Sequence, residues 1–187
     1  GKNKNTPIEL AHKDYVYCLK RCFHIADYVA LNISSPNTAD LRKLSSEDYI
    51  EHLTKEVALH KNNLQKTHKK EVPILLKLSP DEEDSNIEKI ISSSLSNGIS
   101  GFIVSNTTMG EYQNISGGIS GKLLKTKSLD MLKKVKNLLG NESFVISSGG
   151  ISDKSDLQER LDNGAILAQI YTSFIYEGPK VVEELLN

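Results

Sequence analysis

Short apolar segments alternate with amphipathic segments along the whole sequence, and this alternation constrains the fold more than any other feature. Five apolar segments are rich in β-branched residues and have the length of strands: YVALN (28–32), ILLKL (74–78), GFIVS (101–105), FVISS (144–148) and ILAQI (166–170). Six further segments are predicted to be helices: residues 8–24, 46–67, 84–97, 128–139, 153–163 and 177–187. Those at 46–67, 84–97 and 128–139 place apolar residues at steps of three and four. Such alternation, with strands that are almost continuously apolar, predicts an α/β protein whose parallel sheet is covered by helices.

Two architectures fit this pattern, an open doubly wound sheet and a (β/α)8 barrel. A complete barrel has eight strands and usually takes about 250 residues, whereas this chain has 187 residues. No linker-like stretch divides the sequence. We therefore predict that residues 1–187 belong to one domain, and we expect that domain to be incomplete.

Composition and charge argue against several classes of function. The formal net charge is −1, which favours neither nucleic acid nor an anionic membrane surface as a partner. No apolar run approaches the roughly 20 residues of a membrane-spanning helix. Cys18 and Cys22 are predicted to be reduced thiols on one helix, because no further cysteine completes a metal set. All five histidines fall on predicted helices or their ends, and the acidic cluster 81–84 is typical of a helix N-terminus, so no metal is expected.

Small polar or glycine residues occupy the end of every predicted strand. In parallel α/β folds, functional groups gather at the carboxyl ends of the strands, whichever architecture applies. The coincidence therefore predicts one ligand site built from five strand ends. The segments are NISSPNT (32–38), Lys77 within ILLKLSPD, SNTT (105–108), SSGG (147–150) and YT (171–172).

Lys77 and the glycine pair Gly149-Gly150 each have two interpretations. Lys77 either extends from a strand end to water or meets a ligand or counter-ion, and its place inside an apolar run favours the second, since burying an unpaired ammonium is costly. The glycine pair is either an ordinary turn or a turn whose N–H groups approach a phosphate. The glycine-rich stretch 117–121 matches neither a dinucleotide fingerprint nor a P-loop. A set of hydroxyls, carboxamides, one lysine and glycines has little acid–base power and suits a cofactor that brings the difficult chemistry.

Six motifs in order resemble the dihydroorotate dehydrogenases: NISSPNT, LLKLSPD, SNTT, GGISGK (117–122), SSGG and QIYT (169–172). The resemblance runs over essentially the whole chain and is to the class 2, quinone-reducing members. Ser35 stands where class 1 members carry a cysteine, and Tyr171 where they usually carry glycine. The resemblance implies a (β/α)8 TIM barrel, of which this chain supplies the C-terminal portion, about the last five βα units.

The resemblance also implies an activity and a set of residue roles. The reaction is oxidation of dihydroorotate to orotate in de novo pyrimidine biosynthesis, with FMN as cofactor and ubiquinone as electron acceptor. Ser35 would be the general base, with Thr38 as a relay for its proton. The implied substrate-binding residues are Asn32, Asn37, Asn106 and Thr107, and the implied FMN-binding residues are Asn32, Lys77, Ser105, Gly121, Gly150, Tyr171 and Thr172.

Some family features lie outside this sequence or depart from it. Three upstream strands and the N-terminal segment that meets the membrane surface are expected to be missing. The stretch 108–117, a lid loop in the family, is shorter than usual. By resemblance the location is the mitochondrial inner membrane, with a bacterial cytoplasmic membrane as the alternative. Two other functions stay open: another FMN-linked barrel oxidoreductase of class 1 type, and a non-catalytic, degenerate barrel subunit.

Overall fold

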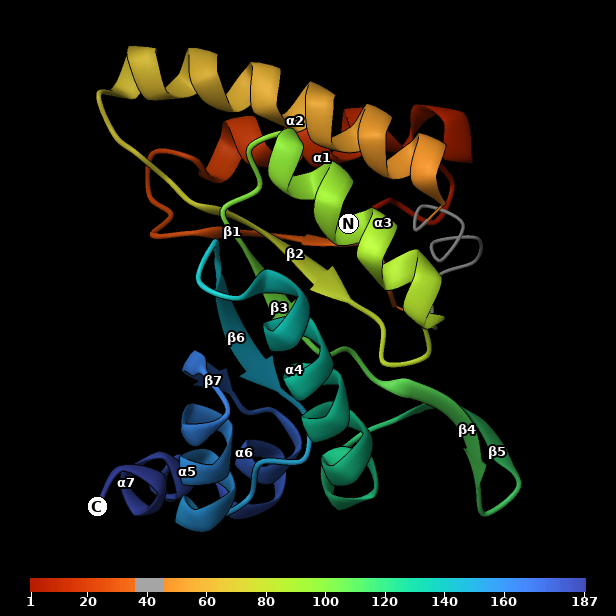
Figure 1. The fold of residues 1–187 in the computed structure, drawn as a ribbon, viewed down its shortest axis with the longest axis vertical. Helices are drawn as coiled ribbons and strands as arrows, with labels where there is room; N and C mark the ends of the chain where they lie inside the picture. The colour runs from red at the N-terminus through yellow and green to blue at the C-terminus, as the bar shows by residue number, and fades with distance from the viewer. Residues whose placement is uncertain (36–45) are drawn as a thin grey trace. The chain divides into compact units, whose positions relative to one another are not determined.

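The computed structural model describes residues 1–35 and 46–187, and its internal contacts divide the chain into two compact units (Figure 1). The first unit comprises Gly1–Lys77 and Glu82–Gly101. The second unit comprises Leu78–Asp81 and Phe102–Asn187. The segment Leu78–Asp81, which begins at the last residue of the second strand, therefore packs with residues that follow it by at least twenty positions.

Five strands form a parallel sheet in the order β1-β2-β3-β6-β7, which confirms the predicted fold class. Each lies within one residue of its predicted position, because unbroken aliphatic runs of this length have few alternatives to a buried strand. The strands are β1 (Val29–Asn32), β2 (Ile74–Leu78), β3 (Gly101–Val104), β6 (Phe144–Ser148) and β7 (Ala165–Gln169).

Helices of the first unit form where the sequence spaces its apolar residues at three and four. In α3, for example, Ile87, Ile90 and Ile91 lie on one face and are buried. The elements are a short 3-10 helix η1 (Ile8–Leu10), α1 (Ala11–Cys22), α2 (Glu47–His68) and α3 (Asp84–Ser96), and α1 and α2 run side by side in Figure 1. Cys18 and Cys22 are free thiols on α1, as predicted.

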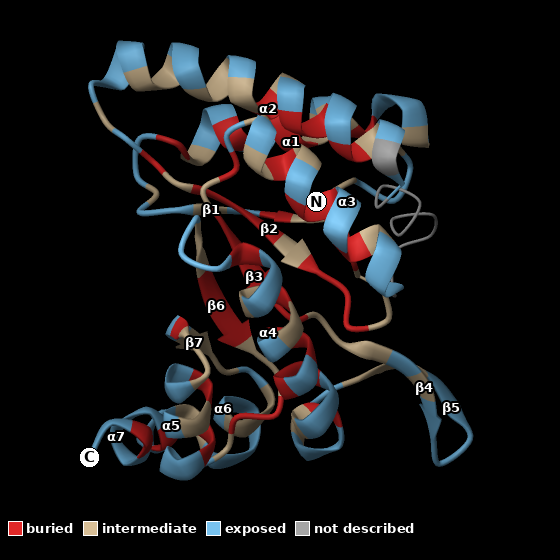
Figure 2. Cartoon of the chain, in the orientation of Figure 1, coloured by how far each residue is buried: buried red, intermediate tan, exposed pale blue. Residues whose placement is uncertain are grey.

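The second unit has β3 and β6 as its most buried strands (Figure 2). Asp153 is the N-cap of α5, where its side chain accepts a hydrogen bond from Asp156 N at 2.8 Å. The helices are η3 (Gly121–Leu124), α4 (Lys125–Leu139), α5 (Lys154–Asp162), α6 (Thr172–Glu177) and α7 (Lys180–Leu186).

An antiparallel hairpin occupies the stretch 108–117, for which the family resemblance implies a lid loop. Strand β4 (Thr108–Tyr112) pairs with β5 (Ile115–Ile119), with Thr108 opposite Ile119. Gln113 and Asn114 turn the chain with positive φ angles of 50° and 63°. The hairpin is largely exposed (Figure 2), so its pairing comes from local backbone hydrogen bonds rather than from an apolar face.

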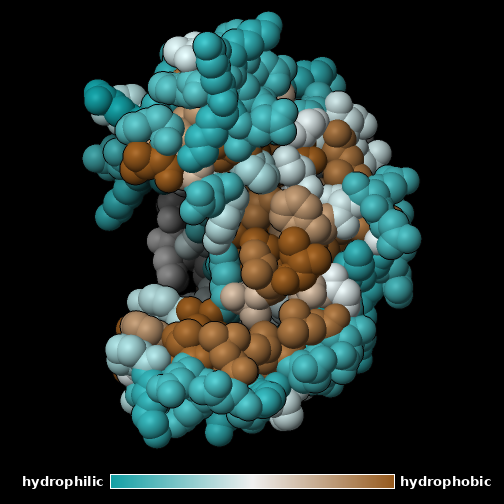
Figure 3. All heavy atoms as spheres, turned by 90° about the vertical axis from the view of Figure 1, so that its left-hand side faces the viewer, coloured by the Kyte–Doolittle hydropathy of each residue, from teal (hydrophilic) through white to brown (hydrophobic). Residues whose placement is uncertain are grey.

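Strand β7 exposes apolar side chains at the edge of the sheet. Ile166 is 55% exposed and Leu167 is 54% exposed. In the lower half of Figure 3, hydrophobic atoms form a continuous band above a hydrophilic lower rim. An edge strand with this character is usually covered by other protein. Within the described residues, no helix has both the length and the apolar character to cross a bilayer.

Candidate functional site

In the first unit, Asn32 and Lys77 lie directly opposite each other at the carboxyl ends of two paired strands. The register of β1 with β2 runs from Val29 opposite Ile74 to Asn32 opposite Lys77. Partners in a parallel pair present their side chains on the same face of the sheet. The structure thus brings together a carboxamide and an ammonium that are 45 residues apart in the sequence, as predicted.

Hydrogen bonds fix the end of β1. The Tyr15 hydroxyl donates to the Asn32 carbonyl at 2.6 Å, and burial raises the pKa of Tyr15, which keeps it a donor. Ser34 N donates to Asn32 Oδ1 at 3.2 Å, and Ser34 Oγ donates to the Lys77 carbonyl at 2.8 Å. Ser34 is buried and was missed by the sequence interpretation, although its position between Asn32 and Ser35 was a usable signal.

Lys77 is partly buried, and its ammonium forms no ion pair with any described carboxylate. Burial lowers the pKa of Lys77 below its ordinary value of 10.5. A cation held in this way is costly to the fold unless a ligand compensates it, so the ligand interpretation of Lys77 is favoured over extension to bulk water.

We expect Lys77→Met to stabilise the ligand-free protein by about 1 kcal/mol at neutral pH, because it removes an uncompensated buried charge. In the wild type, the folded state binds fewer protons than the unfolded chain between the lowered pKa and 10.5, so stability should rise with pH across that window. The variant should lose this rise. Urea unfolding from neutral to alkaline pH measures both effects, with the exposed Lys20→Met as control. A destabilised variant that keeps the pH dependence would contradict this interpretation.

In the second unit, the end of β3 lies beside the end of β6. Ser105 is buried, and its N–H donates to the Ser148 carbonyl at 2.8 Å. Asn106 Oδ1 accepts a hydrogen bond from Thr107 N at 2.9 Å, and Asn106 N donates to the Leu78 carbonyl at 2.9 Å. The SNTT and SSGG motifs are therefore neighbours, as the sequence predicts.

Two buried hydroxyls of the second unit make no hydrogen bond with any described group, Thr107 Oγ1 and Ser147 Oγ. Buried hydroxyls are normally satisfied, so an unsatisfied one at a strand end suggests a ligand or water partner. Thr107 was predicted to bind the substrate. Ser147 was included only as part of the SSGG segment, and no role was assigned to it.

Gly121, Gly150 and Thr172 line one pocket of about 780 Å³ in the second unit. A Cβ at Gly121 would lie 3.0 Å from Thr172 Cγ2, and Thr172 Oγ1 hydrogen-bonds Ser120 Oγ at 2.9 Å. The structure thus brings together three of the predicted FMN-binding residues from three separate segments. Tyr171 is 77% exposed and does not line this pocket.

The glycine turn after β6 has a backbone that only glycine accommodates easily. Gly149 and Gly150 have φ angles of 106° and 73°, a region that favours glycine. A Cβ at Gly150 would lie 2.3 Å from Lys125 Cα, so the turn packs against the start of α4 without room for a side chain. Lys122 supplies a cation to the same pocket.

The structure corrects the prediction that Asp81 belongs to the acidic N-terminus of a helix. We grouped it with the acidic residues at the start of a helix, but α3 begins at Asp84, and Asp81 instead holds the base of the hairpin. Its carboxylate accepts hydrogen bonds from Thr108 Oγ1 and from Met109 N, the latter at 2.9 Å, and pairs with Lys127 Nζ at 2.5 Å. These contacts position Thr108, next to the predicted substrate residues.

Several predicted site residues cannot be placed. Asn37 and Thr38 lie outside the described residues, and so does Pro36. Ser35 is described and is partly buried. The roles assigned to individual residues stay predictions.

Among described side chains, no three His, Cys, Asp or Glu residues gather as metal ligands.

Comparison with known proteins identifies the family. A family model described as Dihydroorotate dehydrogenase matches residues 1–187. Curated proteins named Dihydroorotate dehydrogenase (quinone) are 39% identical in Shewanella woodyi, 38% in Vibrio parahaemolyticus and 37% in Haemophilus influenzae, each over the whole of this chain. The chain spans 57%, 58% and 57% of their lengths.

The solved structures that match this chain are of the same kind of protein as the curated relatives. A crystal structure of DHODH from Eimeria tenella in complex with ferulenol matches 99% of this chain and 54% of its own, with a TM-score of 0.91 and 31% identity. The ligand-free form matches with a TM-score of 0.90 and 30% identity. The alternating fold and its polar strand ends are those of the α/β barrel class. Within that class, the chain belongs to the dihydroorotate dehydrogenase family.

Proposed function

We propose that the protein containing this chain oxidises dihydroorotate to orotate and passes the electrons to a quinone. The observation that carries the proposal is the family match over all 187 residues, in a chain that retains the polar strand ends. The register pairing of Asn32 with the uncompensated Lys77 supports it independently, because these groups suit a polar, electron-accepting ring system.

FMN is the proposed cofactor, and residues at the strand ends are its proposed contacts. The glycine turn at Gly150, with Gly121 and Thr172, would hold the phosphate. Lys77 would lie near the ring, where a positive charge stabilises the extra negative charge of the reduced form. When bound, FMN would accept the hydride from C6 of dihydroorotate and later yield both electrons to the quinone. We include Asn32, Ser105 and Tyr171 among its proposed contacts.

Ser35 is the proposed base that removes the C5 proton of dihydroorotate. A serine hydroxyl has a pKa far above neutrality, so it can act only if its own proton leaves in the same step. Thr38 is the proposed relay for that proton. Pro36 restricts the backbone beside Ser35, which limits the freedom of the hydroxyl near the reacting carbon.

Asparagine carboxamides are proposed to recognise the substrate through hydrogen bonds. A pyrimidine-dione presents donors and acceptors in alternation, and an asparagine offers both on one side chain without net charge. Asn32, Asn37 and Asn106 would bind the ring amides and the carboxylate, and Thr107, with its buried and unsatisfied hydroxyl, would complete the set.

Quinone reduction implies a protein at the surface of a membrane that holds quinone. We propose ubiquinone as the acceptor and a peripheral membrane location. The curated relatives reported above are bacterial, so they do not support the mitochondrial location expected from the resemblance. The bacterial cytoplasmic membrane is the better supported alternative.

An acceptor assay on the full-length protein tests the proposed function. With dihydroorotate as donor, we expect a soluble ubiquinone analogue to be reduced at least about tenfold faster than fumarate, a difference of about 1.4 kcal/mol in activation free energy. Equal or faster reduction of fumarate would instead indicate an acceptor of class 1 type. No turnover with either acceptor, in a protein that holds no flavin, would favour the degenerate subunit.

A further inference from the structure

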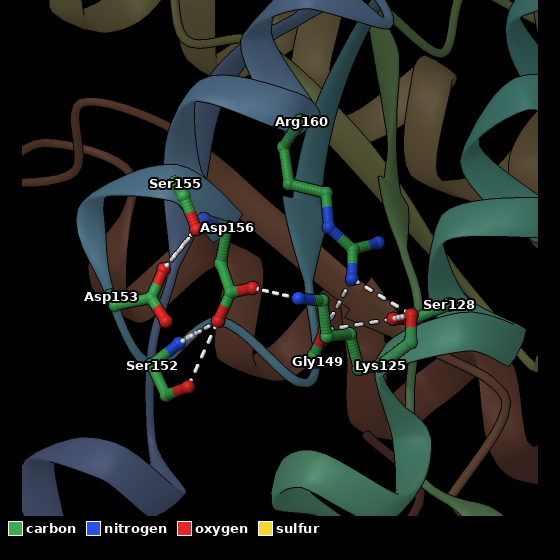
Figure 4. Close-up of polar contacts among 8 residues, drawn as sticks. All are labelled: Lys125, Ser128, Gly149, Ser152, Asp153, Ser155, Asp156 and Arg160. Atoms are coloured by element: carbon green, nitrogen blue, oxygen red, sulfur yellow. Dashed lines mark hydrogen bonds and ion pairs between the residues drawn. The ribbon is translucent and has the colours of Figure 1, made fainter.

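Two oppositely charged residues of α5 are buried behind the glycine turn. Arg160 is fully buried, and Asp156 is 1% exposed. They lie four residues apart on one face of the helix, and Figure 4 shows both side chains directed toward the start of α4 and the turn after β6. Charged side chains are seldom buried without a specific task, because desolvation is costly.

Asp156 joins α4 to the segment after the turn. Its carboxylate pairs with Lys125 Nζ and accepts hydrogen bonds from Ser152 N at 2.8 Å and Ser152 Oγ at 2.9 Å (Figure 4). Burial acts to raise the pKa of Asp156, but the bonds from Lys125 and Ser152 outweigh it and keep the pKa below its ordinary value. The carboxylate is therefore charged at neutral pH and holds Ser152 to Lys125.

Arg160 fixes two backbone carbonyls at once. Its Nη2 donates to the Lys125 carbonyl at 2.9 Å and to the Gly149 carbonyl at 3.2 Å. Ser128 Oγ also contacts both carbonyls, at 3.0 Å and 2.7 Å. The Gly149 carbonyl is thus held toward α4 and α5 by two donors from two helices.

Holding that carbonyl also sets the direction of the next N–H group. The peptide between Gly149 and Gly150 is trans, and in a trans peptide the C=O and N–H bonds point in opposite directions. The Gly150 N–H therefore points away from Ser128 and Arg160. Gly150 lines the pocket of the second unit, and no described group accepts a hydrogen bond from its N–H.

We propose that Arg160 is a positioning residue that sets the Gly149-Gly150 peptide so that the Gly150 N–H can bind the phosphate of FMN. Asp156 supports it by tying Ser152 to Lys125 on the other side of the turn. The proposal rests on the proposed flavin site, and it assigns to α5 a role in nucleotide selection. The Nε and Nη1 atoms of Arg160 have no described partner, so the buried guanidinium uses only part of its hydrogen-bonding capacity.

The test compares FMN with riboflavin, which lacks the phosphate, in fluorescence titrations of the full-length apoprotein. We expect Arg160→Met to weaken FMN binding by about tenfold, the effect of losing one good hydrogen bond. Riboflavin binding should change by less than about twofold. Arg160→Lys, which keeps one charged donor, should recover part of the preference for FMN. Arg21→Met, an exposed arginine on α1, is the matched control.

The outcomes separate this inference from the proposed function. A folded Arg160→Met protein with an unchanged ratio of FMN to riboflavin affinity would overturn the positioning role alone. A wild-type protein that binds neither flavin would overturn the flavin site itself. If Arg160→Met does not fold, the same ratio measured for Arg160→Lys and Ser128→Ala decides, and an unchanged ratio in both would refute the proposal.

Discussion

Replacing Ser35 by alanine should lower the turnover of dihydroorotate by about a thousandfold, within the range that a positioned general base contributes. FMN should remain bound, because none of the described residues around the glycine turn is altered. Stopped-flow measurement of flavin reduction by dihydroorotate isolates the proton-abstraction step from the later reaction with quinone. Near-wild-type reduction at neutral pH would remove Ser35 from the mechanism.

A second replacement at the same position sharpens the test. Ser35→Cys puts a thiol, with an ordinary pKa of about 8.5, where the hydroxyl stood. If position 35 holds the base, this variant should recover part of the lost rate, and the recovered rate should rise with pH as the thiolate forms. A Cys variant as inactive as the Ala variant at every pH would mean that Ser35 acts in some other way.

Gly150→Ala should produce the largest loss of stability, about 3–5 kcal/mol. The new Cβ would lie 2.3 Å from Lys125 Cα and 2.6 Å from Lys125 N, and backbone atoms at the start of a helix cannot move aside cheaply. The φ angle of 73° adds its own cost for a side-chain residue. Chemical unfolding of the full-length protein measures the loss, and flavin content should fall with it.

Gly98→Ala is the matched control for that experiment. Gly98 has a similar φ angle of 81°, but nothing lies within 4 Å of its added Cβ. Gly98→Ala should lower the free energy of unfolding by only about 1 kcal/mol, because only the positive φ angle opposes the new side chain. Equal losses at the two positions would show that the close approach of Gly150 to Lys125 is not what fixes the turn.

The strands were predictable because their signal is local. The run ILLKL is mostly apolar, and β2 is buried on both faces, so the apolar run alone was enough to predict a buried strand. The hairpin β4–β5 was missed for the opposite reason. Its turn uses Gln113 and Asn114 with positive φ, not the usual Asn-Gly or Asp-Gly pair, and its strands contain three glycines. The six-residue helix α6 is too short to show a helical period.

The location of a candidate site residue was predictable where the residue lies at or just after the end of a strand, as Asn32, Lys77 and Gly150 do. Contacts that depend on tertiary packing were not. Helix α5 reads KSDLQERLD, which by composition is a solvated surface helix, yet its Asp156 and Arg160 are buried. The four-residue spacing of the two charges was a signal for one shared face, but only the fold shows that this face lies against a glycine turn.

Anaerobic addition of dihydroorotate to the purified full-length protein is the most direct test of the proposed chemistry. We predict a yellow protein whose flavin absorbance is lost completely with dihydroorotate and returns when a ubiquinone analogue is added. A colourless protein, or a flavin that dihydroorotate does not reduce, would contradict the proposed oxidation of dihydroorotate.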